Sequence, residues 1–416
     1  MASRTNPVLG PRALNRATLA RQLLLTRTEM SARDAVAHLL GLQAQNVKPP
    51  YYQLHARLAG FRPEELSGLM ESREVVRMVT MRSTIHTHTA EDALTLRPLV
   101  QPARDREVGY FRKGLVGVDL ERLTVLAREL VEAAPRTMGE IRDALLKEWP
   151  DADPLALSVA ARCRLPLVQV TPRGLWGRSG QVRLAHLEQW VGETAREAVP
   201  GSAGGRVRET AAREAGPESV GESVREAAPE TALAPVREAA RAGSIEEAVR
   251  RYLGAFGPAS VKDMQTWAGL TRLREVFERL RPELVTFRDE AGVELFDLPD
   301  APRPDADTSA PPRFLPEFDN LLLSHADRTR VVPADLKGRT WKGNQAYCTL
   351  LVDGFLAGVW RLDEDRDRAE LTVELFGAER GPGRRLREEI AAEGERLLAG
   401  MTGAARTSVR FGSISG

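Results

Sequence analysis

The chain has 416 residues, of which 42% are hydrophobic and 28% are charged, and its formal net charge at pH 7 is +1. This composition is typical of a soluble globular protein, and the length predicts roughly two to four domains. No run approaches the roughly 20 apolar residues that span a bilayer, and no secretory signal is recognisable, so we expect a cytoplasmic protein. Cys163 and Cys348 form no CxxC pair, which argues against a disulfide framework and a zinc site.

Positive charge is concentrated in the first 60 residues, which carry eight lysines and arginines against two acidic residues. A basic first domain within a neutral chain is suited to face phosphate groups. A solvated arginine-rich face accounts for the same charge, so both interpretations stay open at this point.

The N-terminal part predicts short helices followed by a β-hairpin, which is the order of elements in a winged helix. Ser31 and Pro49 stand where two of these helices begin. The expected elements are helices over residues 17–25, 32–40, 50–58 and 63–72 and a hairpin over 74–89.

The same order of elements recurs in the middle of the chain. Thr137 and Pro154 start two of the helices there. We expect helices over residues 120–134, 138–149 and 155–165 and a hairpin over 167–185. After them, residues 196–243 contain no aromatic residue and repeat the triplet REA, so this insertion cannot bury enough surface to order itself and is expected to be disordered.

A third copy follows the insertion and has the clearest local pattern. Ser244 and Ser260 can each cap a helix, and an Asp-Glu-Ala-Gly turn separates two alternating segments. The expected elements are helices over residues 244–256, 261–269 and 272–280 and a hairpin over 284–298. Three copies of one supersecondary unit constitute an internal structural repeat.

The C-terminal part changes character to alternating strands. Segments 347–363 and 368–376 alternate as strands do, Asp353-Gly354 is a tight turn, and a helix over 384–400 precedes a last strand near 407–413. We therefore predict an α+β protein with three tandem winged-helix (helix-turn-helix) units and a C-terminal β-rich, barrel-like portion. The expected domains are 1–92, 93–195, the disordered insertion 196–243, 244–300 and 301–416.

Tandem winged helices usually bind nucleic acid, although a protein–protein scaffold explains the same fold. The stretch "GLQAQNVKPPYY", residues 41–52, falls between the second and third helices of the most basic unit. Pro49 and Pro50 restrict how this loop enters the following helix. Side-chain amides held here would point into bound DNA.

At this loop and elsewhere the sequence resembles the AlkZ-type winged-helix DNA glycosylases, which act in azinomycin resistance and unhook interstrand crosslinks. The segments that carry the resemblance are "LNRATLARQLLL", "LGLQAQNVKPPYYQLHARL", "VVRMVTMRSTIHTHTAEDA", "LPEFDNLLLSHADRTRVV" and "LLVDGFLAGVWRL". The family signature of glutamine, aliphatic residue and glutamine matches Gln43-Ala44-Gln45. A sister branch has aspartate in place of the second glutamine, so Gln45 places this chain nearer the AlkZ side. The insertion departs from the family pattern and leaves the loop untouched.

The resemblance implies that Gln43 and Gln45 are catalytic. An N7-alkylated guanine is already cationic and leaves readily, so amide oxygens that hold a water and stabilise an oxocarbenium-like sugar suffice without ionising. We assign Gln45 mainly to the water and Gln43 to the water and the sugar. No lysine lies inside "LQAQN", which predicts monofunctional chemistry, with Lys48 close enough to require testing.

Further residues are expected to contact DNA: Asn46, Lys48, Tyr51, Arg82, His86, His325, Arg328 and Arg330. His86 and His88 share one face of a strand and invite a metal hypothesis, but no further ligand is nearby in the sequence, so no metal or cofactor is expected. The resemblance also implies that a C-terminal hairpin enters the DNA, either at residues 324–330 or at the Asp353-Gly354 turn. Asp319 in "FDN" is interpreted as a turn residue.

Three functional classes explain parts of this pattern. A DNA glycosylase for N7-alkylguanine in double-stranded DNA, acting as a monomer in repair or in self-resistance to an alkylating natural product, explains the paired glutamines and the basic first unit. A winged-helix transcriptional regulator leaves the glutamines without a role. A drug-sequestering protein would need an aromatic pocket, and aromatic residues make up only 5% of the chain.

Overall fold

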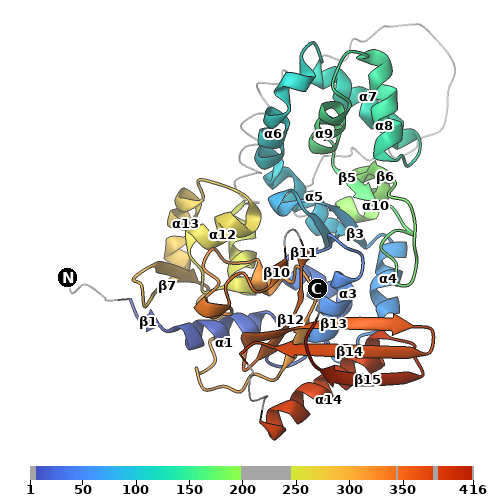
Figure 1. The fold of residues 1–416 in the computed structure, drawn as a ribbon. Helices are drawn as coiled ribbons and strands as arrows, with labels where there is room; N and C mark the ends of the chain where they lie inside the picture. The colour runs from blue at the N-terminus through green and yellow to red at the C-terminus, as the bar shows by residue number, and fades with distance from the viewer. Residues whose placement is uncertain (1–5, 198–244, 343–344, 378–382, 415–416) are drawn as a thin grey trace, which may run out of the picture.

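The computed structural model describes residues 6–197, 245–342, 345–377 and 383–414 and has a mixed α and β architecture (Figure 1). Residues 198–244, which hold nearly all of the predicted insertion, lie outside the described part of the chain. None of the helices in the described ranges is long and apolar enough to cross a membrane.

The first two predicted hairpins are confirmed, and they join in one sheet. The strands are β2 (Leu42–Gln43), β3 (Val75–Val79), β4 (Ile85–Thr89), β5 (Leu167–Gln169) and β6 (Leu184–His186), in the order β2-β4-β3-β5-β6. Every neighbouring pair is antiparallel, and the register between the two hairpins places Arg77 opposite Gln169. Apolar residues of the sheet form a small core with α5 (Ala90–Leu99) and α10 (Leu187–Glu197), which begin directly after β4 and β6.

The helices of the first unit are α1 (Pro11–Arg21), α2 (Ala32–His38), α3 (Pro49–Arg57) and α4 (Pro63–Glu71). Ser31 caps α2 by accepting a hydrogen bond from the Asp34 N–H, as the sequence predicts. Apolar residues of α2, α3 and α4 form one core with the C-terminal sheet, in which Tyr52 meets Trp360. The first unit therefore has no core of its own.

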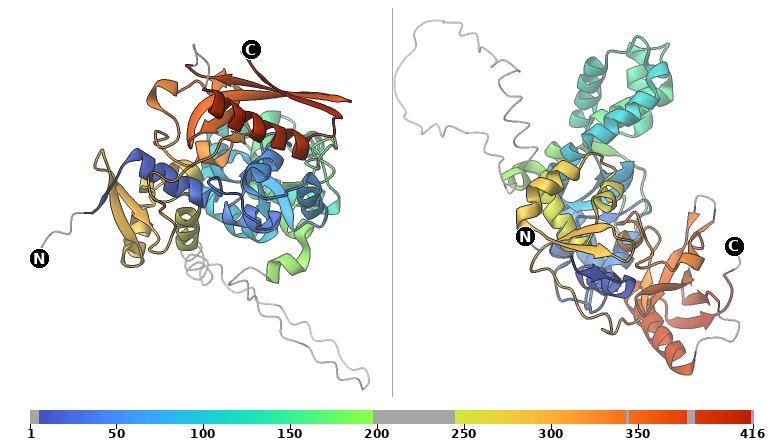
Figure 2. Two further views of the ribbon diagram at one scale, coloured as in Figure 1. Left: turned by 90° about the horizontal axis from the view of Figure 1, so that it is seen from below. Right: turned by 90° about the vertical axis from the view of Figure 1, so that its left-hand side faces the viewer.

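The second unit forms a lobe that projects from the rest of the molecule (Figure 2). Its helices are α6 (Gln101–Tyr110), α7 (Leu120–Ala133), α8 (Met138–Glu148) and α9 (Pro154–Arg164). Thr137 and Glu140 form a reciprocal capping box at the start of α8. Leu123, Ile141 and Leu157 are fully buried at the centre of this lobe.

The third unit has the predicted order of elements. A helix over residues 245–256 is followed by α12 (Val261–Ala268), α13 (Arg274–Leu280) and the antiparallel hairpin of β7 (Val285–Asp289) and β8 (Glu294–Asp297). Ser260 caps α12, and Gly269 ends it in the left-handed conformation with a φ of 70°. The short β1 (Val8–Leu9) runs parallel to β7, so the first described strand belongs to the sheet of this unit.

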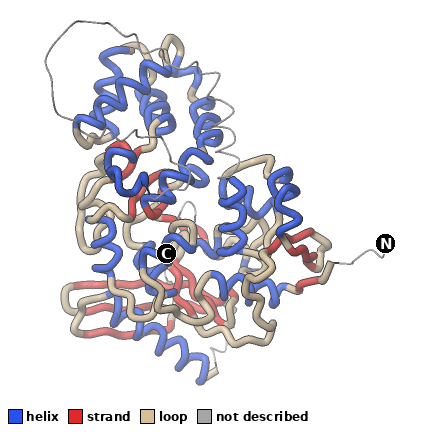
Figure 3. Tube along the Cα trace, turned by 180° about the vertical axis from the view of Figure 1, so that it is seen from behind, coloured by secondary structure: helices blue, strands red, loops and turns tan. Residues whose placement is uncertain are grey.

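The prediction of a barrel-like C-terminal portion is wrong. The strands β9 (Arg313–Leu315), β12 (Cys348–Val352), β13 (Phe355–Asp365), β14 (Arg368–Leu375) and β15 (Arg406–Phe411) form an open sheet in the order β15-β14-β13-β12-β9. The amphipathic helix α14 (Arg384–Met401) crosses one face, and its apolar side shares a core with α3 and the sheet (Figure 3). A sheet covered on one face in this way buries its apolar residues without closing.

Short elements complete the described chain. They are β10 (Trp341–Lys342), β11 (Gln345–Ala346) and the 3₁₀ turns Met81–Ser83, Arg112–Leu115, Arg281–Glu283, Asn320–Leu322 and Ala334–Leu336.

A buried ion pair fastens α1 to the third unit. The Arg21 guanidinium donates to both carboxylate oxygens of Asp297 at 2.5 and 2.8 Å, and the two side chains are 1% and 0% exposed. Arg303 adds a second cation at 2.7 Å from the same carboxylate. Removing one member of such a pair leaves an uncompensated buried charge.

We therefore expect Asp297→Ala to lower the free energy of unfolding by about 3–5 kcal/mol, measured by urea unfolding followed by circular dichroism. Asp363→Ala is the control, because Asp363 pairs with Arg361 at the surface and should matter by less than about 1 kcal/mol. Equal effects of the two substitutions would contradict the assigned role of the buried pair.

Candidate active site

The loop with the two glutamines starts on the edge strand β2 and ends at α3. Gln43 lies opposite His86 of β4, and the Ala44 N–H donates to the Ile85 carbonyl at 2.8 Å. Pro49 and Pro50 occupy the first turn of α3, where their missing N–H groups need no partner. The loop is therefore held by a strand on one side and by a helix on the other.

The Gln43 side chain is buried, and its orientation is fixed by a cation. The Arg82 Nη2 donates to Gln43 Oε1 at 2.6 Å, and Gln43 is only 4% exposed. Because a donor faces it, this atom is the carbonyl oxygen of the amide, and the NH₂ group points the other way. Among the described residues, Arg82 is the one donor to this oxygen that forms a hydrogen bond.

Arg82 itself is held by the third unit. Its backbone is in the left-handed region with a φ of 53°, its Nη1 donates to the Trp267 carbonyl, and a Cβ on Gly269 would lie 3.1 Å from its backbone nitrogen. Burial, together with the charge of Arg328, lowers the pKa of Arg82 to about 10, so the group remains cationic at neutral pH. The Arg82 guanidinium, which donates to Gln43, is thus held in place by α12.

Gln45 and its neighbours face solvent. Gln45 and Asn46 are exposed, and Gln45 Oε1 accepts only a long contact of 3.4 Å from the Ile85 N–H. Asn46 Nδ2 donates to Glu317 at 3.0 Å. The exposed Lys48 ammonium lies 5.7 Å from the Trp176 ring and 3.9 Å from Glu364. A buried and an exposed amide therefore follow one another along the loop.

A buried arginine that sequence reasoning missed donates a hydrogen bond to the backbone of the loop. Arg77 Nη2 donates to the Ala44 carbonyl at 2.8 Å, and burial lowers the pKa of Arg77 to about 10. Tyr51, which is 1% exposed, donates to the Gly174 carbonyl at 2.7 Å in the same region. The available signal was an arginine inside the otherwise apolar strand "VVRMV".

The two strand histidines are buried, and their rings stack with centroids 5.6 Å apart. His86 Nδ1 donates to the Thr84 carbonyl at 3.0 Å and Nε2 accepts from Arg82 at 3.3 Å, which assigns the neutral tautomer. Burial lowers the pKa of His86 well below its usual value and that of His88 to about 4. No group of three or more metal-ligating side chains occurs within the described ranges.

The three predicted residues of the segment 325–330 lie in different environments. His325 is 1% exposed and its Nε2 lies 2.9 Å from the Phe256 carbonyl, while Arg330 is 6% exposed and donates to the Pro258 carbonyl at 2.8 Å. Arg328 is exposed. The Asp353-Gly354 turn is tied to α1, because Arg12 and Arg16 pair with Asp353.

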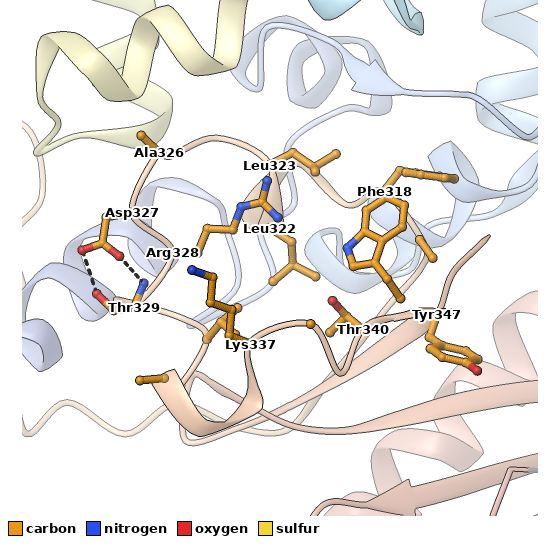
Figure 4. Close-up of a pocket in the computed structure, with 15 residues that line it drawn as sticks. Phe318, Leu322, Leu323, Ala326, Asp327, Arg328, Thr329, Lys337, Thr340 and Tyr347 are labelled. Carbon is orange, nitrogen blue, oxygen red and sulfur yellow. Dashed lines mark hydrogen bonds between the residues drawn. The ribbon is translucent and has the colours of Figure 1, made fainter. Parts of the chain in front are cut away.

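A cavity of about 420 Å³ lined by residues between Phe318 and Tyr347 was also missed by sequence reasoning. Figure 4 shows Arg328 and Lys337 toward one end of it and Phe318 and Tyr347 toward the other. The Phe318 and Trp341 rings meet edge to face with centroids 5.6 Å apart. Its signal in the sequence was the mixture of basic and aromatic residues in "LKGRTWKG".

The matching family model, for residues 36–399, is described as DNA glycosylase AlkZ-like. The chain belongs to the AlkZ-like DNA glycosylase family. The match includes the whole glutamine loop, Arg82 and the cavity residues, and it confirms the resemblance seen in the sequence motifs.

Among solved structures, the AlkZ-like chain is similar to Streptomyces sahachiroi DNA glycosylase AlkZ, with a TM-score of 0.70 over 97% of this chain and 100% of that chain. The two sequences are 19% identical, so this likeness concerns the fold. A search among curated proteins gave no match.

Four buried histidines of this AlkZ-like chain make its stability depend on pH. Burial lowers the pKa of His55 and His88 to about 4 and of His325 to about 3, and His86 shifts in the same direction. A lowered pKa means that the unfolded chain binds protons first as pH falls. The stability is therefore complete above pH 6.5 and decreases below it.

We expect each of these histidines to contribute a loss that begins near pH 6.5 and steepens toward about 1.4 kcal/mol per pH unit as pH falls to 5. Thermal unfolding at pH 8, 7, 6 and 5 measures the effect, with a melting temperature that is flat above 7 and falls below 6.5. His325→Gln should reduce the slope, and an unchanged slope in this variant would contradict the assignment.

Proposed function

We propose that the chain is a monofunctional DNA glycosylase that hydrolyses the N-glycosidic bond of N7-alkylated guanine in duplex DNA. The observation that carries the proposal is the pair of glutamines in which one amide is fixed by Arg82 and the next is open to solvent. Membership of the AlkZ-like DNA glycosylase family supports the same chemistry.

The reaction needs no ionisable base at the sugar. The C1′–N9 bond breaks with its electron pair going to the guanine, which thereby loses its positive charge, and the sugar becomes oxocarbenium-like. The Gln43 Oε1 atom faces the developing positive charge and the attacking water, and the exposed Gln45 amide holds that water. Water attacks C1′ and releases its proton to solvent.

Preorganisation is the main contribution of the protein. The Arg82 contact keeps the Gln43 carbonyl in one orientation before the substrate binds, so that no reorganisation is required at the moment of bond cleavage. Since N7-alkylguanine is a good leaving group, positioning and fixed dipoles suffice.

DNA binding is assigned to exposed residues around the loop. Asn46, Lys48 and Arg328 are exposed and can reach phosphate or sugar groups. Tyr51, His86, His325 and Arg330 are buried and contribute by holding the segments that carry these contacts, and Arg82 does so through Gln43. The three helix–hairpin units act as winged helices, and the chain works as a monomer.

The proposal extends to interstrand crosslinks joined through guanine N7. The loop is reached from the protein surface, with exposed residues at Gln45, Asn46 and Lys48. An open loop of this kind accommodates a guanine that is tethered to the opposite strand. The enzyme would thereby serve repair or self-resistance to a DNA-alkylating natural product.

We expect Gln43→Ala and Gln45→Ala each to lower the single-turnover excision of N7-methylguanine by about 10²–10³-fold, because each removes a preorganised dipole. Binding to the same duplex should change by less than about threefold, since both amides contribute little to phosphate contacts. Gln189→Ala is the control, because Gln189 is an exposed glutamine that bonds to the Glu132 carbonyl in another part of the chain. Unchanged excision in both variants would refute the glutamine mechanism.

We also expect that borohydride traps no protein–DNA adduct during excision. Lys48 is directed toward Trp176 and Glu364, and an attack on C1′ by its amine would require another orientation. Lys48→Ala should retain the excision rate within about threefold while weakening DNA binding at low salt. A trapped adduct that disappears in Lys48→Ala would instead identify a bifunctional enzyme.

A further inference from the structure

On one side the backbone of β2 pairs with β4, and no strand of the described ranges pairs with its other side. In the sheet order β2-β4-β3-β5-β6, β2 is an edge strand, and its pairing with β4 uses the groups of Leu42 and Ala44. The peptide groups of Gln43 therefore point away from the sheet. Buried peptide groups without partners are costly, so something else has to satisfy them.

Two side-chain amides occupy this other side of β2. Asn320 Nδ2 donates to the Gly41 carbonyl at 2.6 Å, while its Oδ1 accepts from the Gln43 N–H at 3.4 Å. Gln53 Nε2 donates to the Gln43 carbonyl at 3.0 Å. The Asn320 amide thus offers β2 the donor and the acceptor that a peptide group of a neighbouring strand would offer.

Asn320 is in turn fixed by the residue before it. The Arg57 guanidinium donates to both oxygens of Asp319 at 2.8 Å, and neither side chain is exposed. Asp319 also accepts from the Leu321 N–H at 2.9 Å, and Phe318 enters the turn with a φ of 62°. Because Arg57 ends α3, one turn of the chain holds both ends of the glutamine loop: β2 through Asn320 and α3 through Asp319.

We propose that Asn320 is a positioning residue for base excision, which replaces the missing neighbour of β2 and thereby fixes the Gln43 backbone. Asp319 and Arg57 anchor it. This inference rests on the proposed function, because Gln43 is the group through which Asn320 acts. The segment "FDN", interpreted from the sequence as a turn, would thereby also position the Gln43 backbone.

The position of Gln43 is sensitive to this contact. Arg82 fixes the amide end of the side chain and Asn320 fixes its backbone, so that the carbonyl oxygen is held from two directions. A displacement of about 1 Å at a catalytic group can cost about 10²-fold in rate. Loss of Asn320 should therefore affect the chemical step more than DNA binding.

The test compares full-length wild type, Gln43→Ala, Asn320→Ala and Asn320→Asp in single-turnover excision of N7-methylguanine from a duplex oligonucleotide. We expect Asn320→Ala to lower the rate by about 10–100-fold with a dissociation constant for the duplex within about twofold of wild type. Asn320→Asp keeps the volume and the acceptor but turns a carboxylate oxygen toward the Gly41 carbonyl, so its rate should fall as well. If Asn320→Ala does not fold, the excision rate of Asn320→Asp decides the test.

Asn15→Ala is the matched control. Asn15 is another fully buried asparagine whose Nδ2 bridges two carbonyls, those of Arg330 and Gly354, at 2.8 Å each. Its loss should lower the melting temperature about as much as Asn320→Ala while leaving the excision rate within about twofold.

Each outcome separates the two proposals. If wild type excises and Gln43→Ala does not, wild-type rates in both Asn320 variants overturn the positioning role alone. The positioning role is also overturned if Asn320→Ala and Asn15→Ala lose excision rate to the same extent and this loss follows the fall in melting temperature. If wild type releases no base, the proposed function fails and the positioning role fails with it.

Discussion

A guanidinium group withdrawn from water needs partners, because an unpaired buried charge costs several kcal/mol. Arg16, Arg21 and Arg57 are fully buried in this chain. Their partners Asp353, Asp297 and Asp319 follow 337, 276 and 262 residues later. The N-terminal segment that carries the glutamine loop is therefore fastened to late segments at three points. The rest of the fold, including the loop itself, depends on these long-range pairs.

Local features of the fold were predictable from the sequence, since they depend on neighbouring residues. The caps at Ser31, Thr137 and Ser260 and the Asp353-Gly354 turn all occur where the sequence places them. The union of two hairpins through β3 and β5 and the open C-terminal sheet depend on contacts between distant segments. Alternation along a strand shows which face is buried but does not tell which strand is its neighbour.

The site was predictable to a similar degree. The glutamine loop was located by its motif, and the roles of Gln43 and Gln45 stay predictions. Burial of His86, His325 and Arg330 could not be foreseen, because a polar side chain in a loop or hairpin becomes buried only when another segment covers it. For His325 and Arg330 that segment is the end of the helix over 245–256 and the residues after it. Asn320 acts on a strand that lies 277 residues earlier in the chain.

The pairing of β3 with β5 has a consequence for how such a protein can evolve. Tandem repeats are often gained, lost or exchanged as separate modules. Here the second unit supplies β5 and β6 to the sheet of the first. Loss of that unit would uncover the mostly apolar edge of the five-residue strand β3, and such an edge promotes aggregation. The repeats resemble tandem modules in the linear sequence, but the first two can be inherited only together.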